Sequence, residues 1–237
     1  IIYDGTTSRW IITTPKESQF RGLQYGTAMG STTAGDWGTF AWATAGTAAA
    51  VTANAASSSA LGNFQCQTGT TSSGAAVAYF TKTIVTPFYF SLGHINAFAI
   101  ISFPILSDGT NTYQIAALIT ASPSSTNQNP NNSVGIRYDS SVNSGKWQGF
   151  SRDNAGTEST VDLGITAAVN THYLLRVEID KSKTEARFYI DGIMLGRVTG
   201  NMPNSVASGS RLSIIKSAGT TSRVVNVHAF YSETIIG

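Results

Sequence analysis

The chain has 237 residues, of which 41% are hydrophobic and only 12% are charged, and its formal net charge is +2. This composition excludes an intrinsically disordered chain, and the scattered basic residues exclude an extended footprint for nucleic acid or insertion into an anionic membrane. The single cysteine, Cys66, excludes an intrachain disulfide and a zinc site built from cysteines, and no apolar run of about 18 residues is present to span a membrane. Because the chain begins with Ile1 rather than Met, we expect a processed product or a part of a longer polypeptide.

The first third of the chain differs in composition from the rest. Residues 1–25 contain short apolar runs such as "RWIITTP" and predict a strand with loops, and residues 26–76 are rich in Ala, Thr, Ser and Gly. Alanine favours a helix, but the apolar periodicity of an amphipathic helix is missing, so extended or irregular structure is the favoured interpretation. We expect residues 1–76 to form an N-terminal docking portion of one domain that spans residues 1–237.

From residue 77 onward, short runs rich in β-branched and aromatic residues alternate with turn signals. Such regular spacing of short strands is typical of a sandwich or jelly roll. We therefore predict an all-β, two-sheet antiparallel jelly-roll sandwich whose strand-rich core spans 77–237. The expected strands are "AVAYFTKTIV", "AFAIISFPIL", "TYQIAALITA", "SVGIRYD", "KWQGFSRD", "TESTVDLG", "HYLLRVEID", "ARFYID", "IMLGRV", "RLSIIKS" and "SRVVNVHAFYSE".

The stretch "RFYIDGIMLGRV" at 187–198 contains the clearest hairpin signal. An Asp-Gly pair between alternating residues favours a type I′ turn, which needs positive φ at both central positions. With Asp191 and Gly192 at the turn and 181–184 as the preceding loop, one register separates the aliphatic face from the charged face. The predicted pairs are Ile190 with Ile193, Phe188 with Leu195, Arg187 with Gly196, Asp180 with Glu185, Glu178 with Arg187, Arg176 with Tyr189, Val177 with Phe188, and Leu175 with Ile190.

Two longer stretches carry a resemblance to a known family. They are "NTHYLLRVEIDKSKTEARFYIDGIMLGRVTGNMP" at 170–203 and "IIKSAGTTSRVVNVHAFYSE" at 214–233. Together with the strands from residue 134 onward, they resemble the concanavalin A-like lectin/glucanase domains, in the LamG-like jelly-roll form found in bacteriophage and prophage virion structural proteins. The motifs are structural, so the resemblance implies a two-sheet jelly roll and does not imply a chemistry.

The carboxylates near residue 180 lack the partner that catalysis in this family needs. Glycoside hydrolases similar to laminarinases carry E-x-D-x-x-E on one strand, and their retaining mechanism needs two carboxyl groups about 5–5.5 Å apart. Here Glu178 and Asp180 match, but Lys183 replaces the second Glu. Polysaccharide-lyase relatives use Gln-x-His, whereas Gln114 is followed by Ala116. We therefore predict no catalytic residue and no enzyme.

Metal sites have little support in the sequence. The three histidines are not at metal-ligand spacing and are interpreted as half-exposed strand residues. Calcium sites occur in relatives of the family, but the candidate oxygen ligands in loops lack EF-hand-like spacing. We predict no metal and no cofactor, with calcium as the alternative. The residues concerned are His94, His172 and His228, and for calcium Asp108, Asn111 and Asp139.

A glycan-binding surface is the main alternative to a purely structural role. Lectin sites combine an aromatic stacking surface with hydrogen bonds from Asn, Asp and Arg. Trp147 in "GKWQGF" is the first candidate, with Tyr138, Tyr189 and Arg152 beside it. The competing interpretation is that Trp147 packs against a sheet edge or a neighbouring subunit.

Our functional expectation is a non-enzymatic virion structural protein, such as a phage capsid decoration, fibre or tail-appendage subunit, that acts through assembly and surface display. Its expected partners are other virion proteins and further copies of itself, and its expected location is the extracellular particle, assembled in the host cytoplasm. The alternative is a lectin-like adhesion module that binds a host surface glycan. A glycoside hydrolase or lyase is the least favoured, because of Lys183.

Overall fold

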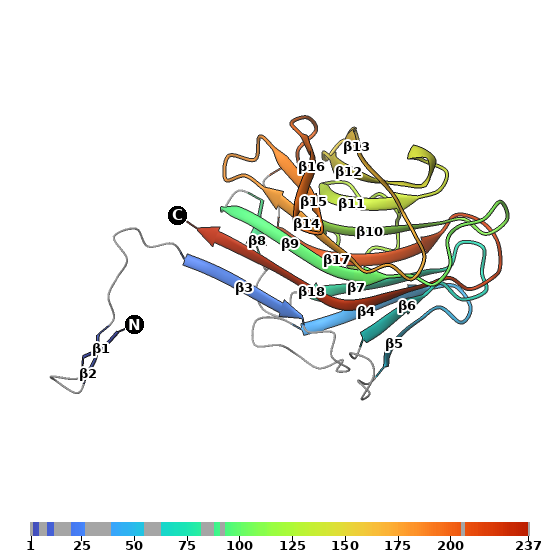
Figure 1. Cartoon of the computed structure of the whole chain (residues 1–237), viewed down its shortest axis with the longest axis horizontal. Helices are drawn as coiled ribbons and strands as arrows, with labels where there is room; N and C mark the ends of the chain where they lie inside the picture. The colour runs from blue at the N-terminus through green and yellow to red at the C-terminus, as the bar shows by residue number, and fades with distance from the viewer. Residues whose placement is uncertain are drawn as a thin grey trace.

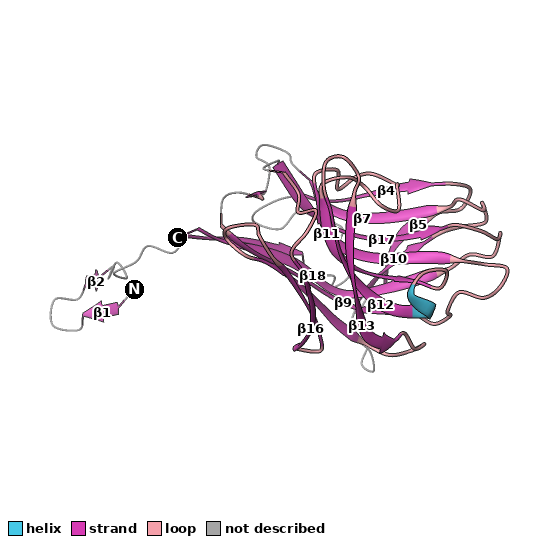
Figure 2. Cartoon of the chain, turned by 90° about the horizontal axis from the view of Figure 1, so that it is seen from above, coloured by secondary structure: helices cyan, strands magenta, loops and turns pink. Residues whose placement is uncertain are grey.

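The computed structural model describes residues 2–4, 9–11, 20–26, 39–54, 63–81, 88–90, 93–204 and 207–236. The described part consists of β-strands and one short 3-10 turn, as Figure 2 shows in magenta and cyan. The predicted all-β, two-sheet antiparallel sandwich is confirmed. The elements are β1 (Ile2–Asp4), β2 (Arg9–Ile11), β3 (Phe20–Gly26), β4 (Thr39–Ala45), β5 (Ala50–Asn54), β6 (Asn63–Gln67), β7 (Ala75–Thr81), β8 (Phe88–Tyr89), β9 (His94–Ser102), β10 (Tyr113–Thr120), β11 (Ser133–Asp139), η1 (Asn143–Gly145), β12 (Lys146–Arg152), β13 (Glu158–Thr166), β14 (Tyr173–Ile179), β15 (Ala186–Ile190), β16 (Ile193–Val198), β17 (Ala207–Lys216) and β18 (Val224–Ile236).

Two large sheets form the sandwich, and each is named here after its central strand. The β17 sheet has the order β13-β12-β11-β10-β17-β7-β4, with β8 also paired to β17. The β18 sheet has the order β16-β15-β14-β9-β18-β6-β5, with β3 also paired to β18. Within the Ala-rich and Thr-rich part of the chain, the described residues include three strands, β4 in one sheet and β5 and β6 in the other.

The last two strands of the chain lie at the centres of the two sheets. β17 inserts between β10 and β7, and β18 inserts between β9 and β6, as the adjacent red and green arrows in Figure 1 show for β18 and β9. Consecutive strands belong to different sheets at β3–β4, β4–β5, β6–β7, β8–β9, β9–β10, β13–β14, β16–β17 and β17–β18. The sandwich is therefore held by pairings between distant parts of the sequence, which form slowly because they close long loops. In the part of the chain that the structure describes, no helix is both long and apolar enough to cross a membrane.

The predicted register of β14 against β15 is confirmed at four of the five predicted pairs. The fifth, Asp180 with Glu185, lies just beyond the strands and agrees with this register, because Asp180 N donates to Glu185 O at 3.1 Å. Asp191 and Gly192 have φ of 53° and 80°, as a type I′ turn requires. Next to that turn the predicted pair of Ile190 with Ile193 is confirmed, but the pairs farther along β16 are wrong by one residue, because the register shifts between Phe188 and Tyr189. Phe188 faces Gly196 instead of Leu195, since a β-bulge places one extra residue on one strand.

The core between the sheets is rich in aromatic side chains. Trp147 is fully buried, and its ring lies 5.2 Å from the ring of Tyr173 and 6.0 Å from that of Tyr138. Gly149 keeps the β17 sheet close to Phe188, because a Cβ at position 149 would lie 2.3 Å from the Phe188 ring. The inner faces of the two sheets therefore pack so closely here that one added carbon atom would not fit.

Candidate functional site

The outer face of the β18 sheet carries a partly exposed cluster of charged and aromatic side chains. Because alternate residues of a strand point to the same side, four adjacent strands send their outward side chains to one surface. We call this surface the Glu178 face. It consists of His94, Asn96 and Phe98 on β9, Arg176 and Glu178 on β14, Arg187 and Tyr189 on β15, and Tyr231 and Glu233 on β18.

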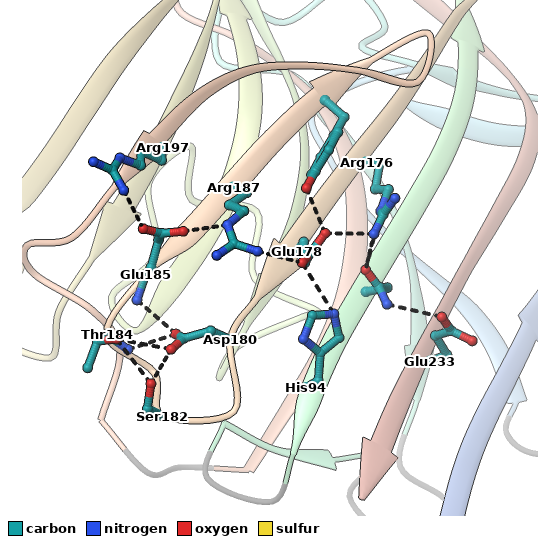
Figure 3. Close-up of polar contacts among 12 residues, drawn as sticks. His94, Arg176, Glu178, Asp180, Ser182, Thr184, Glu185, Arg187, Arg197 and Glu233 are labelled. Atoms are coloured by element: carbon teal, nitrogen blue, oxygen red, sulfur yellow. Dashed lines mark hydrogen bonds and ion pairs between the residues drawn. The ribbon is translucent and has the colours of Figure 1, made fainter. Parts of the chain in front are cut away.

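Glu178 is the hub of this face, as the dashed lines in Figure 3 show. Its Oε2 accepts hydrogen bonds from Arg176 Nη2 at 2.6 Å and from the Tyr189 hydroxyl at 2.8 Å. Its Oε1 accepts a hydrogen bond from Arg187 Nη1 at 3.2 Å and lies 3.6 Å from His94 Nε2. The Glu178 side chain is only 10% exposed, so these donors replace the water that the carboxylate has lost.

Arg176 fixes the middle of the face. Besides Glu178, its Nη2 donates to Asn96 Oδ1 at 3.1 Å, and Asn96 Nδ2 in turn donates to Glu233 Oε1 at 3.0 Å. The Arg176 guanidinium also lies 4.5 Å from the centre of the Tyr189 ring and 5.5 Å from that of Phe98. Cation–π contacts of this kind hold the planes of both rings.

Aromatic rings extend the face toward β18. Phe98 and Tyr231 stack with their ring centroids 4.4 Å apart and their planes 9° from parallel. Desolvation and the hydrogen bond to Glu178 raise the pKa of Tyr189, which keeps its hydroxyl protonated as a donor. The face therefore offers preorganised donors and acceptors beside half-exposed rings. Such a surface is suited to the hydroxyl groups and apolar C–H groups of a polar ligand.

The four residues predicted for a glycan surface do not lie together. Trp147 is 0% exposed and Tyr138 is 2% exposed, and both point into the core between the sheets. A ring without solvent access cannot stack on a sugar, so the assignment of these two residues to a glycan surface was wrong. Arg152 lies on the outer face of the β17 sheet, where its Nη1 is 3.6 Å from Glu158 Oε2. Only Tyr189 belongs to the Glu178 face.

Part of the Glu178 face could be predicted from the sequence. The predicted hairpin register already placed Arg176, Glu178, Arg187 and Tyr189 on one side. The contributions of β9 and β18 were missed, because β9 pairs with β14 and β18 pairs with β9 across long sequence separations. Hairpin patterns do not reveal such pairing.

The acidic motif after β14 has a structural use. Asp180 Oδ1 accepts hydrogen bonds from the backbone N–H groups of Thr184 and Glu185, both at 2.8 Å. Lys183 occupies the left-handed region, with φ of 56°. Asp180 and Lys183 thus shape the tight loop between β14 and β15, while Glu178 alone faces the cluster. The Gln114 side chain, which the lyase comparison singled out, donates to Asn129 Oδ1 at 3.2 Å.

The candidate calcium ligands are used in separate turns. Asp108 Oδ1 accepts hydrogen bonds from the backbone N–H groups of Asn111 and Thr110 at 2.6 and 2.8 Å, and these bonds hold the pKa of Asp108 below its usual range. Asp108 Oδ2 pairs with Arg223. Asp139 Oδ1 accepts from Ser141 N at 2.8 Å. Among the described residues, no three His, Cys, Asp or Glu side chains are grouped so as to hold a metal ion.

Two histidines meet at one end of the same sheet. The rings of His172 and His228 lie 4.5 Å apart, and His228 Nε2 is 3.0 Å from Ser102 Oγ. Burial and the neighbouring His172 lower the pKa of His228, so the His228 imidazole is neutral near pH 7. The third, His94, is the one that lies at the Glu178 face.

Comparison with protein families shows to which family the chain belongs. Residues 59–228 match the family described as "SO2946-like, C-terminal domain". The chain belongs to this family. The matched residues include β9, β14 and β15, so most of the strands of the Glu178 face lie within the SO2946-like domain. Comparison with curated proteins gives no match.

Solved structures share the fold of this SO2946-like domain. The binding domain of Paraclostridial Mosquitocidal Protein 1 has a TM-score of 0.57 at 11% identity, and the match covers 92% of this chain and 49% of that chain. The Botulinum Neurotoxin serotype G binding domain has a TM-score of 0.55 at 13% identity, over 90% of this chain and 47% of that chain. The chain thus spans about half the length of these toxin domains. The Emp47p carbohydrate recognition domain has a TM-score of 0.55 at 9% identity, over 94% of this chain and 99% of that domain. These TM-scores show a common lectin-like jelly-roll fold.

Proposed function

We propose that this chain is a carbohydrate-binding module and that it binds its glycan on the Glu178 face. The observation that carries the proposal is the exposed arrangement of Tyr189, Phe98 and Tyr231 around the Arg176–Glu178–Asn96 network. Rings and fixed polar groups of this kind can contact both the C–H faces and the hydroxyl groups of a sugar.

The comparisons add unequal support to this proposal. The Emp47p domain is matched over nearly its whole length and is described as a carbohydrate recognition domain. The toxin domains are described as binding domains, but only about half of each is matched. We therefore base the ligand class on the Emp47p likeness and on the chemistry of the face. Catalysis is not needed for this function.

The role on a virion stays a prediction. The same binding module would serve a tail appendage or fibre that attaches to a host glycan, with other virion proteins and further copies of this chain as partners. Electron microscopy of native particles labelled for this chain would place it, and a chain absent from every particle would contradict the prediction.

Substitution of Arg176 tests the glycan site. We expect Arg176→Ala to weaken glycan binding by at least about tenfold, because the change removes a donor and releases the rings of Tyr189 and Phe98. The ligand is first identified with the wild-type chain on a glycan array, and its affinity is then measured by calorimetry.

The matched control is Arg197→Ala. Arg197 lies on the same sheet with its side chain 65% exposed and contacts Glu185 at 3.0 Å, outside the Glu178 face. The Arg197→Ala variant should bind the glycan with the same affinity as the wild type. Absence of any glycan binding by the wild type, or equal losses in both variants, would overturn the proposal.

A further inference from the structure

The outer face of the β17 sheet is covered by a part of the chain itself. Ala116 and Leu118 are each 1% exposed and Phe150 is 0% exposed, and together they form a second apolar cluster outside the main core. Residues 121–132, which connect β10 to β11, lie across this sheet, and we call them the strap. The contacts that place it are Asn127 O with Arg211 Nη2 at 2.6 Å, Gln128 Nε2 with Ile215 O at 3.3 Å, and Asn129 Oδ1 with Arg137 Nη1 at 3.0 Å and Gln114 Nε2 at 3.2 Å.

Arg211 is a buried cation without an acidic partner under this strap. Its side chain is 0% exposed, and among the described residues its Nε and Nη1 have no hydrogen-bond partner. Within the same part of the chain, its Nη2 donates to Asn127 O and to Ser213 Oγ at 3.2 Å. Burial lowers the pKa of Arg211 to about 10. A buried charge that lacks a partner costs several kcal/mol, so its retention calls for an explanation.

Arg137, on the same face, is a buried arginine whose guanidinium donors have hydrogen-bond partners. It is 6% exposed, its Nη1 and Nη2 bind the two carboxylate oxygens of Glu158 at 2.9 and 2.6 Å, and its Nε binds Gln148 Oε1 at 2.9 Å. Arg211 is 0% exposed and has none of these partners among the described residues. The Nε and Nη1 donors, which bind oxygen acceptors in Arg137, are unpaired in Arg211 within the part of the chain that the structure describes.

The strap itself cannot supply an anion for these donors. Its sequence, "ASPSSTNQNPNN", contains no charged residue, so it offers Arg211 only a neutral carbonyl. The strap is held at its ends, where Ala121 N donates to Asn132 O at 3.0 Å and Asn132 N donates to Asp153 O at 3.1 Å. Its middle is held by the side-chain contacts of residues 127–129 given above, which opening of the strap would break. If the middle of the strap moves away, both edges of the guanidinium become free for a planar, bidentate oxyanion.

We propose that Arg211 is the anchor of a second ligand site, which binds the carboxylate of an acidic saccharide when the strap opens. Neighbouring groups fit such a ligand. Gln114 Oε1 is buried, has no hydrogen-bond partner in the described part of the chain, and can accept a hydrogen bond from a sugar hydroxyl. Tyr79 lies opposite Arg211 on β7 and is only partly buried, so its ring is available to the sugar face. This site lies on the opposite sheet from the Glu178 face and does not depend on it.

The test compares acidic monosaccharides with their neutral esters on the wild-type chain. The probes are glucuronate and N-acetylneuraminate, each beside its methyl ester, with sodium sulfate as a simple oxyanion, and binding is followed by NMR of the arginine Nε–Hε signals and the strap amides. We expect both acids to shift the Arg211 and strap signals, and the esters to bind at least about tenfold more weakly. A response to sulfate alone, equal responses to acids and esters, or no response would overturn the proposal.

Variants separate this site from the Glu178 face. Arg211→Gln should abolish the response to the acids without lowering the melting temperature, because it removes an unpaired buried charge. Arg197→Gln is the matched control and should respond as the wild type does. Loss of stability in Arg211→Gln with unchanged acid binding would assign Arg211 a purely structural role. Neutral glycans that bind the Glu178 face should bind Arg211→Gln normally, so failure of one proposal leaves the other testable.

Discussion

Replacement of Trp147 by alanine should lower the free energy of unfolding by about 3–5 kcal/mol, the range for a large aromatic side chain removed from a packed core. Trp147 is fully buried and contacts the rings of Phe103, Tyr138 and Tyr173 at centroid distances of 6.1, 6.0 and 5.2 Å. The loss combines the transfer of the indole from water and the cavity left among these rings. Urea unfolding at 25 °C measures it.

The control for this prediction is Trp147→Phe. Trp147 Nε1 has no hydrogen-bond partner among the residues that the structure describes, so phenylalanine loses volume but no hydrogen bond and should cost much less than alanine. Glycan affinity per folded molecule should be unchanged in both variants, because the ring has no access to solvent. A stable Trp147→Ala variant that has lost glycan binding would show that the ring does reach a ligand.

Replacement of Glu178 by alanine should lower the free energy of unfolding by about 2 kcal/mol, with the exposed part of the network discounted for solvent screening. The change leaves the inner N–H groups of Arg176 and the Tyr189 hydroxyl without their acceptor. It also places Arg176, Arg187 and His94 together without the carboxylate between them. Thermal and urea unfolding would measure the effect on stability.

Glu178→Gln is the variant to compare with Glu178→Ala. It keeps an oxygen acceptor in place and removes the charge, so it should cost less stability than alanine while still weakening glycan binding through the mobility of Arg176. If Glu178→Ala matches the wild type in both stability and binding, the carboxylate does not organise the face.

The sequence predicts pairings between residues that are close together in the chain, and it does not predict pairings between residues that are far apart in the chain. The Asp191–Gly192 hairpin and its register against β14 follow from local rules of turn geometry and alternation, and they are confirmed. The bulge after Phe188 was not foreseen, because no local pattern marks which residue of β16 is the extra one. The insertion of β17 and β18 into the sheet centres depends on global topology.

The same distinction explains the errors in the site. Trp147 was placed on a surface because large aromatics are common in lectin sites, yet alternation along β12 sends it inward beside outward Gln148. Phe98 and Asn96 were missed because their neighbours on β14 lie far away in the sequence, and Glu233 was missed because its neighbour on β9 does. Arg211 looked like an ordinary strand residue, because only the strap across the sheet makes it a buried charge.

The central claim is that the Glu178 face of this SO2946-like domain binds a glycan. The most direct test is an NMR titration of the wild-type chain, with assigned amide and arginine side-chain signals, using the glycan that binds most tightly on the array. We predict that the largest shifts arise from Arg176, Arg187, Tyr189 and their neighbours on β9 and β18. Shifts confined to other surfaces, with the signals of these strands unmoved at saturation, would contradict the account.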